Sequence, residues 1–262
     1  MPRLTRPTTS CPIEQWQLPD TVGAIQTERT GGVSKGAYQS LNLGLHVQDE
    51  VAAVTENRQR LLQQMPGCKH LHWLNQVHGT ALFHGHRAPR CVPDADASVS
   101  QMAGHGCVIM TADCLPVLFC ANDGSEVAAA HAGWRGLALG VLEQTIASMK
   151  TPASALRVWL GPCIGPLAFE VGDEVRTTFT EHDPNAADAF AHSSDGKWLA
   201  DIQLLAVMRL AGVGVHQISA DLRCTYQNAA HFFSYRRACQ PNSLSQGVTG
   251  RMASAIWIKA NA

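Results

Sequence analysis

Three segments of the chain place a histidine or a cysteine at the end of a strand-like run, inside a glycine-rich or polar turn. These residues are His78 in segment 75–80, Cys114 in segment 111–116 and His131 in segment 130–136. Because strand ends open onto loops, a rigid scaffold can present reactive side chains there. Two imidazoles and one thiolate suit Zn²⁺, and three protein ligands leave a fourth position for water or substrate. The spacing therefore predicts a catalytic zinc site.

The same residue types allow two other interpretations. Cys114 can be a nucleophile that a neighbouring histidine activates as a base. It can also be a buried free cysteine that packs as a small hydrophobe beside two hydrogen-bonded histidines. Residue type alone leaves these alternatives open. Asp113 precedes Cys114 directly and is a candidate proton carrier, or a residue that orients a metal ligand.

Two arginines are candidates for binding an anion. Arg135 follows His131 by four residues, where a helix is expected to begin. A helix N-terminus attracts anions, and a guanidinium can add a bidentate phosphate clamp. The alternative is a plain surface arginine. Arg29, beside the Thr30-Gly31-Gly32 turn, suggests the same role.

Most of the twelve histidines are interpreted as ordinary side chains. Five are expected at the surface: His46, His70, His182, His192 and His216. Three more alternate around strand-like segments and are expected to be exposed: His72, His84 and His86. The run 233–237 combines aromatic and guanidinium groups, which can stack on a flat ligand or form an aromatic edge with solvated charges.

The elements that must position these residues follow from hydrophobic periodicity and turn signals. Strands are predicted at residues 23–28, 71–74, 81–84, 107–111, 116–120, 127–131, 156–160, 215–219 and 255–258. Helices are predicted at residues 49–65, 134–149, 172–181 and 201–211, the last with Asp201 as N-cap. Adjacent strands without intervening helices between residues 71 and 131 favour an α+β fold with mixed sheets. Residues 1–20 are expected to form a loose leader, and residues 240–246 a polar surface loop.

The bulk composition limits the class of protein. The chain has 262 residues, of which 45% are hydrophobic and 16% charged, enough for one large domain or two small ones. The net charge of −1 provides no basic field for nucleic acid or an anionic membrane. No segment reaches the roughly 20 apolar residues of a membrane helix, and the first twenty residues lack a secretory signal. We therefore expect a cytoplasmic location with reduced cysteines, since the nine cysteines contain no CxxC pair.

Taken together, the motifs resemble those of the laccase-domain or multicopper polyphenol oxidase-like family, also called YfiH-type purine nucleoside phosphorylases. The matching segments keep the family's order and span residues 22 to 258. They are residues 27–34, 40–44, 57–58, 75–80, 94–97, 111–116, 128–136, 161–165, 169–172, 232–237 and 250–253.

The resemblance implies a single catalytic domain over residues 21–262, with a four-layer α/β/β/α sandwich. It also implies that His78, Cys114 and His131 match the family's metal ligands. Arg29, Asn42 and Arg58 lie in matching segments and are expected, with Arg135, to bind substrate or phosphate. The stretch between Arg237 and Gly250 is longer than the family's usual spacing, and this difference bears on substrate preference.

The function that the resemblance implies is zinc-dependent phosphorolysis of adenosine, inosine and methylthioadenosine, with adenosine deaminase activity. Cys114, His131, Asp113 and Arg135 are the expected catalytic residues, and a nucleoside and phosphate are the expected partners of a monomer. Three alternatives remain. One is a cysteine-type amidase that edits peptidoglycan precursors, the second is a copper polyphenol oxidase, and the third is a non-enzymatic metal-stabilised binding module.

Overall fold

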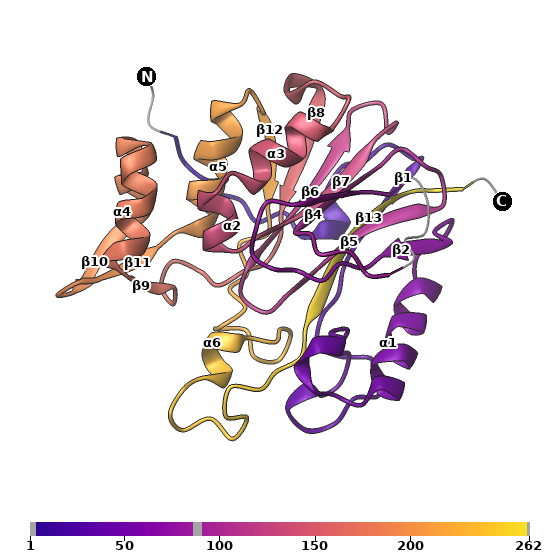
Figure 1. Cartoon of the computed structure of the whole chain (residues 1–262), viewed down its shortest axis with the longest axis horizontal. Helices are drawn as coiled ribbons and strands as arrows, with labels where there is room; N and C mark the ends of the chain where they lie inside the picture. The colour runs from indigo at the N-terminus through magenta and orange to yellow at the C-terminus, as the bar shows by residue number, and fades with distance from the viewer. Residues whose placement is uncertain (1–3, 86–90, 261–262) are drawn as a thin grey trace.

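The computed structural model describes residues 4–85 and 91–260, and two sheets form its centre (Figure 1). The strands of the six-stranded sheet are, in spatial order, β12 (Gln217–Ala220), β8 (Leu156–Leu160), β6 (Leu115–Ala121), β7 (Val127–Ala132), β4 (Ala97–Ser100) and β3 (Leu82–His84). Those of the four-stranded sheet are β1 (Val22–Gln26), β13 (Met252–Ile258), β5 (His105–Thr111) and β2 (His70–His72). Both sheets contain parallel and antiparallel pairs.

The alternation of side chains along the central strands separates the layers. Cys107 and Ile109 of β5 pack in the apolar cluster between the two sheets, whereas Val108 belongs to the cluster on the outer face. On β6, Leu118 joins the cluster between the sheets and Phe119 faces the opposite way. Because successive strand residues point to opposite faces, fully buried strands such as these require an apolar cover on both sides.

Helices supply that cover and complete four layers. Helix α1 (Val51–Gln63) packs Leu61 on the outer face of the four-stranded sheet. Leu142 of α3 (Val141–Ser148) and Leu205 of α5 (Ile202–Gly212) lie in the cluster on the outer face of the six-stranded sheet. The remaining helices are α2 (Trp134–Ala138), α4 (Asp173–His182) and α6 (Tyr235–Ala238). The expected single-domain α+β sandwich with mixed sheets is confirmed.

The observed secondary structure differs from the predictions in several places. The single helix expected over residues 134–149 is two helices, because Gly140 between α2 and α3 adopts the left-handed region with φ 92°. A third sheet of β9 (Glu170–Gly172), β11 (Lys197–Ala200) and β10 (Phe190–Ser194) was not predicted, nor was β4. Most side chains of β10 are exposed, so this strand lacks the apolar alternation that reveals a strand in sequence.

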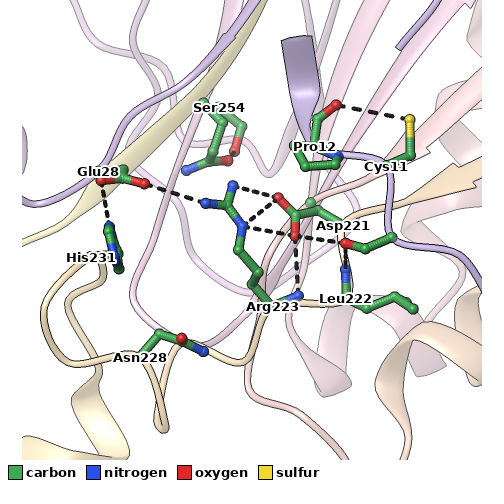
Figure 2. Close-up of polar contacts among 12 residues, drawn as sticks. Cys11, Pro12, Glu28, Asp221, Leu222, Arg223, Asn228, His231 and Ser254 are labelled. Carbon is green, nitrogen blue, oxygen red and sulfur yellow. Dashed lines mark hydrogen bonds and ion pairs between the residues drawn. The ribbon is translucent and has the colours of Figure 1, made fainter. Parts of the chain in front are cut away.

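The described part of the expected leader packs against the six-stranded sheet. The backbone N–H of Cys11 donates to the Ala220 carbonyl at 2.7 Å, and the Trp159 indole donates to the Cys11 carbonyl at 2.8 Å. Figure 2 shows the polar network beside it, in which Arg223 bridges Asp221 at 2.6 Å and Glu28 at 3.3 Å. Among the described helices, none has the length and apolar character needed to cross a membrane.

Candidate metal centre

The fold brings His78, Cys114 and His131 to one point. One ligand atom from each residue lies within 4.8 Å of the others, and Cys114 Sγ is 4.0 Å from His78 Nε2. Cys114 directly precedes β6 and His131 lies near the end of the neighbouring antiparallel strand β7, so both lie at the same end of these two central strands. His78 arrives on the loop that follows β2. Across residues 4–85 and 91–260, no other group of His, Cys or carboxylate residues converges this closely.

The buried carboxylate of Asp96 supports two of these three residues. Its Oδ1 lies 2.8 Å from His131 Nδ1 and accepts the backbone N–H of His78 at 2.9 Å. Its Oδ2 accepts the backbone N–H groups of Val77 at 3.2 Å and Gly79 at 2.7 Å. These bonds hold the loop in which His78 adopts a left-handed φ of 60°. A carboxylate on Nδ1 fixes the ring and leaves Nε2 of His131 for a metal ion.

The charges of the cluster favour a thiolate. Burial alone would raise the pKa of Cys114, but the neighbouring His131 and His78 imidazoles lower it to about 6. Burial alone would lower the pKa of His131, but Cys114 and Asp96 raise it to about 9. Burial also opposes ionisation of Asp96, but hydrogen bonds from His131 and the loop N–H groups lower its pKa overall. A thiolate is both the metal ligand and the nucleophilic form of cysteine.

Gly133 leaves the space that a bound ion needs. A Cβ atom at this position would lie 3.1 Å from Cys114 Sγ, 3.1 Å from His78 Cδ2 and 3.7 Å from His131 Nε2. All three ligand side chains therefore face one small space, which even a methyl group would fill. This space and the N, N, S donor set fit a zinc ion.

The Asp113 carboxylate fixes the turn that contains Cys114. Its backbone has a left-handed φ of 96°, and its carboxylate accepts bonds from Thr225 Oγ1 at 2.6 Å, Ser234 Oγ at 2.9 Å and the Arg236 backbone N–H at 2.7 Å. These donors come from segments more than 100 residues away in sequence. Of its two predicted roles, this geometry suits orientation of the ligand rather than proton transfer.

Three of the predicted phosphate-binding residues donate hydrogen bonds to other groups of the protein. Arg29 donates to the carbonyls of Gln39 at 3.0 Å and Ala229 at 3.1 Å. Arg58 donates to the Leu43 carbonyl at 3.0 Å and lies over the Trp73 ring. The third is fully buried Asn42, whose amide hydrogens go to Gly44 and Asp49.

Arg135 remains the predicted cation on the surface near the cluster. It is exposed at the second position of α2, with Cζ 4.5 Å from the centroid of the Trp134 ring. Trp134 and Cys114 line one cavity of about 150 Å³, together with Ile164, Phe169 and Tyr235 among others.

His46 and Arg251 also lie beside the centre, although sequence reasoning assigned them no role in it. A Cβ at Gly44 would lie 2.9 Å from the Arg251 side chain and 3.4 Å from the His46 ring, so these two side chains are neighbours. Desolvation lowers the pKa of Arg251, and the negative charges of Cys114 and Asp113 partly oppose this decrease. Desolvation also lowers the pKa of His46, and the charges of Arg251, Arg58, His131 and His78 lower it further.

His46 and Arg251 line a second cavity of about 190 Å³. Its other walls include Gly247, Val248 and Thr249, which belong to the long stretch between Arg237 and Gly250. The only signal for Arg251 in the sequence was its place in the matching segment 250–253. His46 is exposed, as expected, and its position beside Arg251 follows only from the folded chain.

Comparisons with known proteins agree with this architecture. The sequence pattern described as "Multi-copper polyphenol oxidoreductase laccase" matches residues 23–259. The chain is 49% identical to the purine nucleoside phosphorylase YfiH of Escherichia coli, covering 94% of this chain and 98% of that protein. It is also 49% identical to a purine nucleoside phosphorylase of Pseudomonas aeruginosa, covering 93% and 96%.

Solved structures give the same result. A crystal structure of a Neisseria meningitidis DUF152 protein superposes with a TM-score of 0.87 at 48% identity, covering 94% of this chain and 97% of that one. YlmD from Geobacillus stearothermophilus superposes with a TM-score of 0.81 at 32% identity, covering 92% and 93%. Family pattern, sequence identity and fold all agree over nearly the whole chain. The chain therefore belongs to the multi-copper polyphenol oxidoreductase laccase family.

Proposed function

We propose that this protein is a zinc-dependent purine nucleoside phosphorylase that cleaves adenosine, inosine and methylthioadenosine. The single observation that carries the proposal is the convergence of His78, Cys114 and His131 within 4.8 Å beside a cavity lined by aromatic side chains. The printed names of the Escherichia coli and Pseudomonas aeruginosa relatives point to the same activity. We further propose a cytoplasmic monomer.

His78, Cys114 and His131 would hold the zinc ion. When bound, zinc supplies a Lewis acid beside the reacting atoms. Asp96 keeps the His131 ring oriented and the His78 loop closed, so the donors are positioned before the ion arrives. Copper is the alternative ion for a His₂Cys donor set. A multicopper oxidase needs further ligand groups, and the described residues form one convergent group of this kind.

The cavity beside Cys114 suits the purine base. Its volume of about 150 Å³ is below that of a site for a whole drug-sized ligand, so it would take the base and leave the ribose outside. Trp134, Phe169 and Tyr235 offer flat faces on which a purine can stack. The ribose would then extend past Cys114 toward the phosphate.

Arg251 is the phosphate-binding cation that the geometry favours, in place of Arg29 and Arg58. Its Nη1 also donates to backbone carbonyls, those of Thr249 at 3.0 Å and Gly250 at 3.2 Å in its own segment. Arg251 nevertheless neighbours His46, lies within electrostatic reach of Cys114 and lines a separate cavity of about 190 Å³. In phosphorolysis, a phosphate oxygen bonds to ribose C1′ while the bond from C1′ to the purine nitrogen breaks. Arg251 would hold phosphate near C1′, so that proximity lowers the barrier. Exposed Arg135 would contribute as a second cation at the rim.

Adenosine deamination is included in the proposal as a second reaction of the same site. Here water replaces the amino group at purine C6 and ammonia leaves. A mixed histidine and cysteine zinc set also serves base deaminases, which supports the assignment by chemistry alone. The two reactions differ in their need for phosphate, so product analysis separates them.

A cysteine-type hydrolase is a second candidate, which one specific observation favours. Asp96, His131 and Cys114 lie in the order carboxylate, imidazole and thiol, and the pKa of Cys114 is lowered to about 6. This is the arrangement of an activated nucleophile with an oriented base. Such an enzyme would cleave an amide, for example in a peptidoglycan precursor, through an acyl-cysteine intermediate.

The test is to incubate the purified protein with adenosine, inosine and methylthioadenosine, each with and without phosphate. We expect free base and ribose 1-phosphate, or its methylthio analogue, only with phosphate, and inosine from adenosine without it. Turnover of an amide substrate with a covalent adduct on Cys114, and no nucleoside turnover, would favour the hydrolase instead.

A further inference from the structure

A second group of histidines lies away from the candidate metal centre, at the edge where β2 meets β5. In the parallel register of these strands, His70 pairs with His105, and His72 pairs with Cys107. Residues two apart on a strand share a face, so His70, His72 and His105 project on the same side of the sheet. His72 also contacts Phe83 of β3, at 5.4 Å between ring centroids, which places the group between the edges of the two large sheets.

Two of these rings already have a separation close to that of metal ligands. His72 Nε2 lies 3.0 Å from His105 Nδ1. Two nitrogens that are each 2.0–2.1 Å from a tetrahedral metal ion are about 3.3 Å apart. A small opening of this pair would therefore admit an ion in place of the shared proton.

The surroundings keep both rings in the neutral form that binds metals. The expectation that His72 is exposed was wrong, since this side chain is 2% exposed, and His105 is half-buried. Desolvation lowers the pKa of each ring, and the neighbouring histidine charges lower it further. Neutral imidazole is the ligand form of histidine, so protons compete weakly with a metal ion here.

His70 offers a third nitrogen from the solvent side. Its ring is exposed, and its centroid lies 5.0 Å from that of His105. The three rings are not as tightly convergent as His78, Cys114 and His131, so His70 would turn toward the pair on binding. An exposed side chain can make this rotation without disturbing the core.

We propose that His70, His72 and His105 form a second metal site, which takes a divalent transition-metal ion such as Zn²⁺ through three imidazoles. Imidazole ligands suit Zn²⁺, and the absence of a thiolate makes this site weaker than the first. The ion would link edge strand β2 to β5. Its ligand His72 lies six residues before His78 in the sequence. This site does not depend on the proposed nucleoside chemistry.

Cobalt titration of the metal-stripped full-length protein tests the proposal, because Co²⁺ reports its ligands by absorption. We expect two ions per chain, the first with a thiolate charge-transfer band from Cys114 and the second with ligand-field bands only. Competition by Zn²⁺ should displace both ions.

The variants His105→Gln and His70→Gln should each weaken the second ion at least tenfold and leave the thiolate band unchanged. His192→Gln, at an exposed position on β10, is the matched control and should bind both ions as the wild type does. Because buried His72 can be needed for folding, the test relies on the two less buried positions, with circular dichroism of each variant. Binding of one ion by the wild type, or a second ion that His105→Gln retains at full affinity, would overturn the proposal.

Discussion

Asp96 lies 2.8 Å from His131, and the same carboxylate accepts backbone hydrogen bonds from the loop that carries His78. One buried side chain therefore orients two of the three proposed metal ligands. The third, Cys114, depends on a separate carboxylate, that of Asp113. Two buried carboxylates, those of Asp96 and Asp113, therefore position the three ligands. Each can be substituted in a variant that keeps all three ligand residues.

The first prediction concerns Asp96→Asn. An asparagine amide cannot accept every hydrogen bond that the carboxylate accepts, and it removes the charge that stabilises the His131 ring. We expect zinc affinity to fall ten- to a hundredfold, as is typical for loss of a residue that orients a ligand. Competition with a chromogenic chelator measures the change. Asp123→Asn, in the exposed turn after β6, is the control, and equal zinc affinity in both variants would refute the anchoring role.

The second prediction concerns Gly133→Ala. Its backbone lies in the extended region at φ −61° and ψ 156°, which alanine adopts freely, so folding should persist. The new Cβ would approach Cys114 Sγ and His78 Cδ2 at 3.1 Å and occupy the ion's space. We expect zinc affinity to drop on the order of tenfold or more, since metal sites tolerate shifts of only a few tenths of an ångström.

Gly212→Ala is the matched control, because a Cβ at that position meets nothing within 4 Å. Isothermal titration of both variants, with thermal unfolding of each, separates lost metal binding from lost structure. A Gly133→Ala protein that binds zinc as tightly as Gly212→Ala would show that the ion does not occupy this space.

The third prediction concerns the phosphate site. Arg251→Gln should raise the KM for phosphate about ten- to a hundredfold, because a charge-assisted hydrogen bond contributes about 1.5–3 kcal/mol. Zinc content should remain unchanged, since Arg251 is not a ligand. Arg60→Gln, which removes a surface arginine paired with Glu56, should leave the KM as it is. If Arg29→Gln raises the KM and Arg251→Gln does not, the original sequence-based assignment of Arg29 is the better one.

The fourth prediction concerns acid stability. Burial, together with the charges of His105 and His70, lowers the pKa of His72 from 6.5 to about 4. Between these values the unfolded chain binds a proton that the folded chain does not, so stability is lost as the pH falls from about 6.5 toward 4. This difference in pKa corresponds to a stability change on the order of 3 kcal/mol.

Urea unfolding between pH 7.5 and 4.5 in the presence of a chelator measures this loss. His72→Leu removes the titrating group and should lose less stability on acidification than the wild type. Identical pH dependence in the two proteins would mean that His72 does not contribute to acid sensitivity.

The three proposed metal ligands were visible in the sequence because each was predicted at the end of a strand or in the turn after it, and the structure brings them together. Asp96 was not identified, since a carboxylate in segment 94–97 gives no local sign that it will face His131, 35 residues later. His46 and Arg251 are likewise neighbours only in the folded chain. Local patterns locate the turns, but tertiary packing decides which polar side chains meet in them.

The same limit applies to the predicted binding residues and to the fold. Arg29 and Arg58 have the right charge, but their guanidinium groups donate to backbone carbonyls of other segments of the chain, which no sequence motif indicates. The long apolar strands β5, β6 and β7 were predicted correctly because both of their faces are buried. The short strand β10 was missed because its side chains are mostly exposed.

The most direct test of the account is phosphate-dependent release of hypoxanthine from inosine by the same protein before metal removal, after removal and after return of one equivalent of zinc. We predict release only when zinc and phosphate are both present, with activity regained in proportion to the zinc bound. A Cys114→Ala variant should fold and remain inactive at every step, which also separates an enzyme from a metal-stabilised binding module. Full release of hypoxanthine by the metal-stripped protein, or none under any condition, would contradict the account.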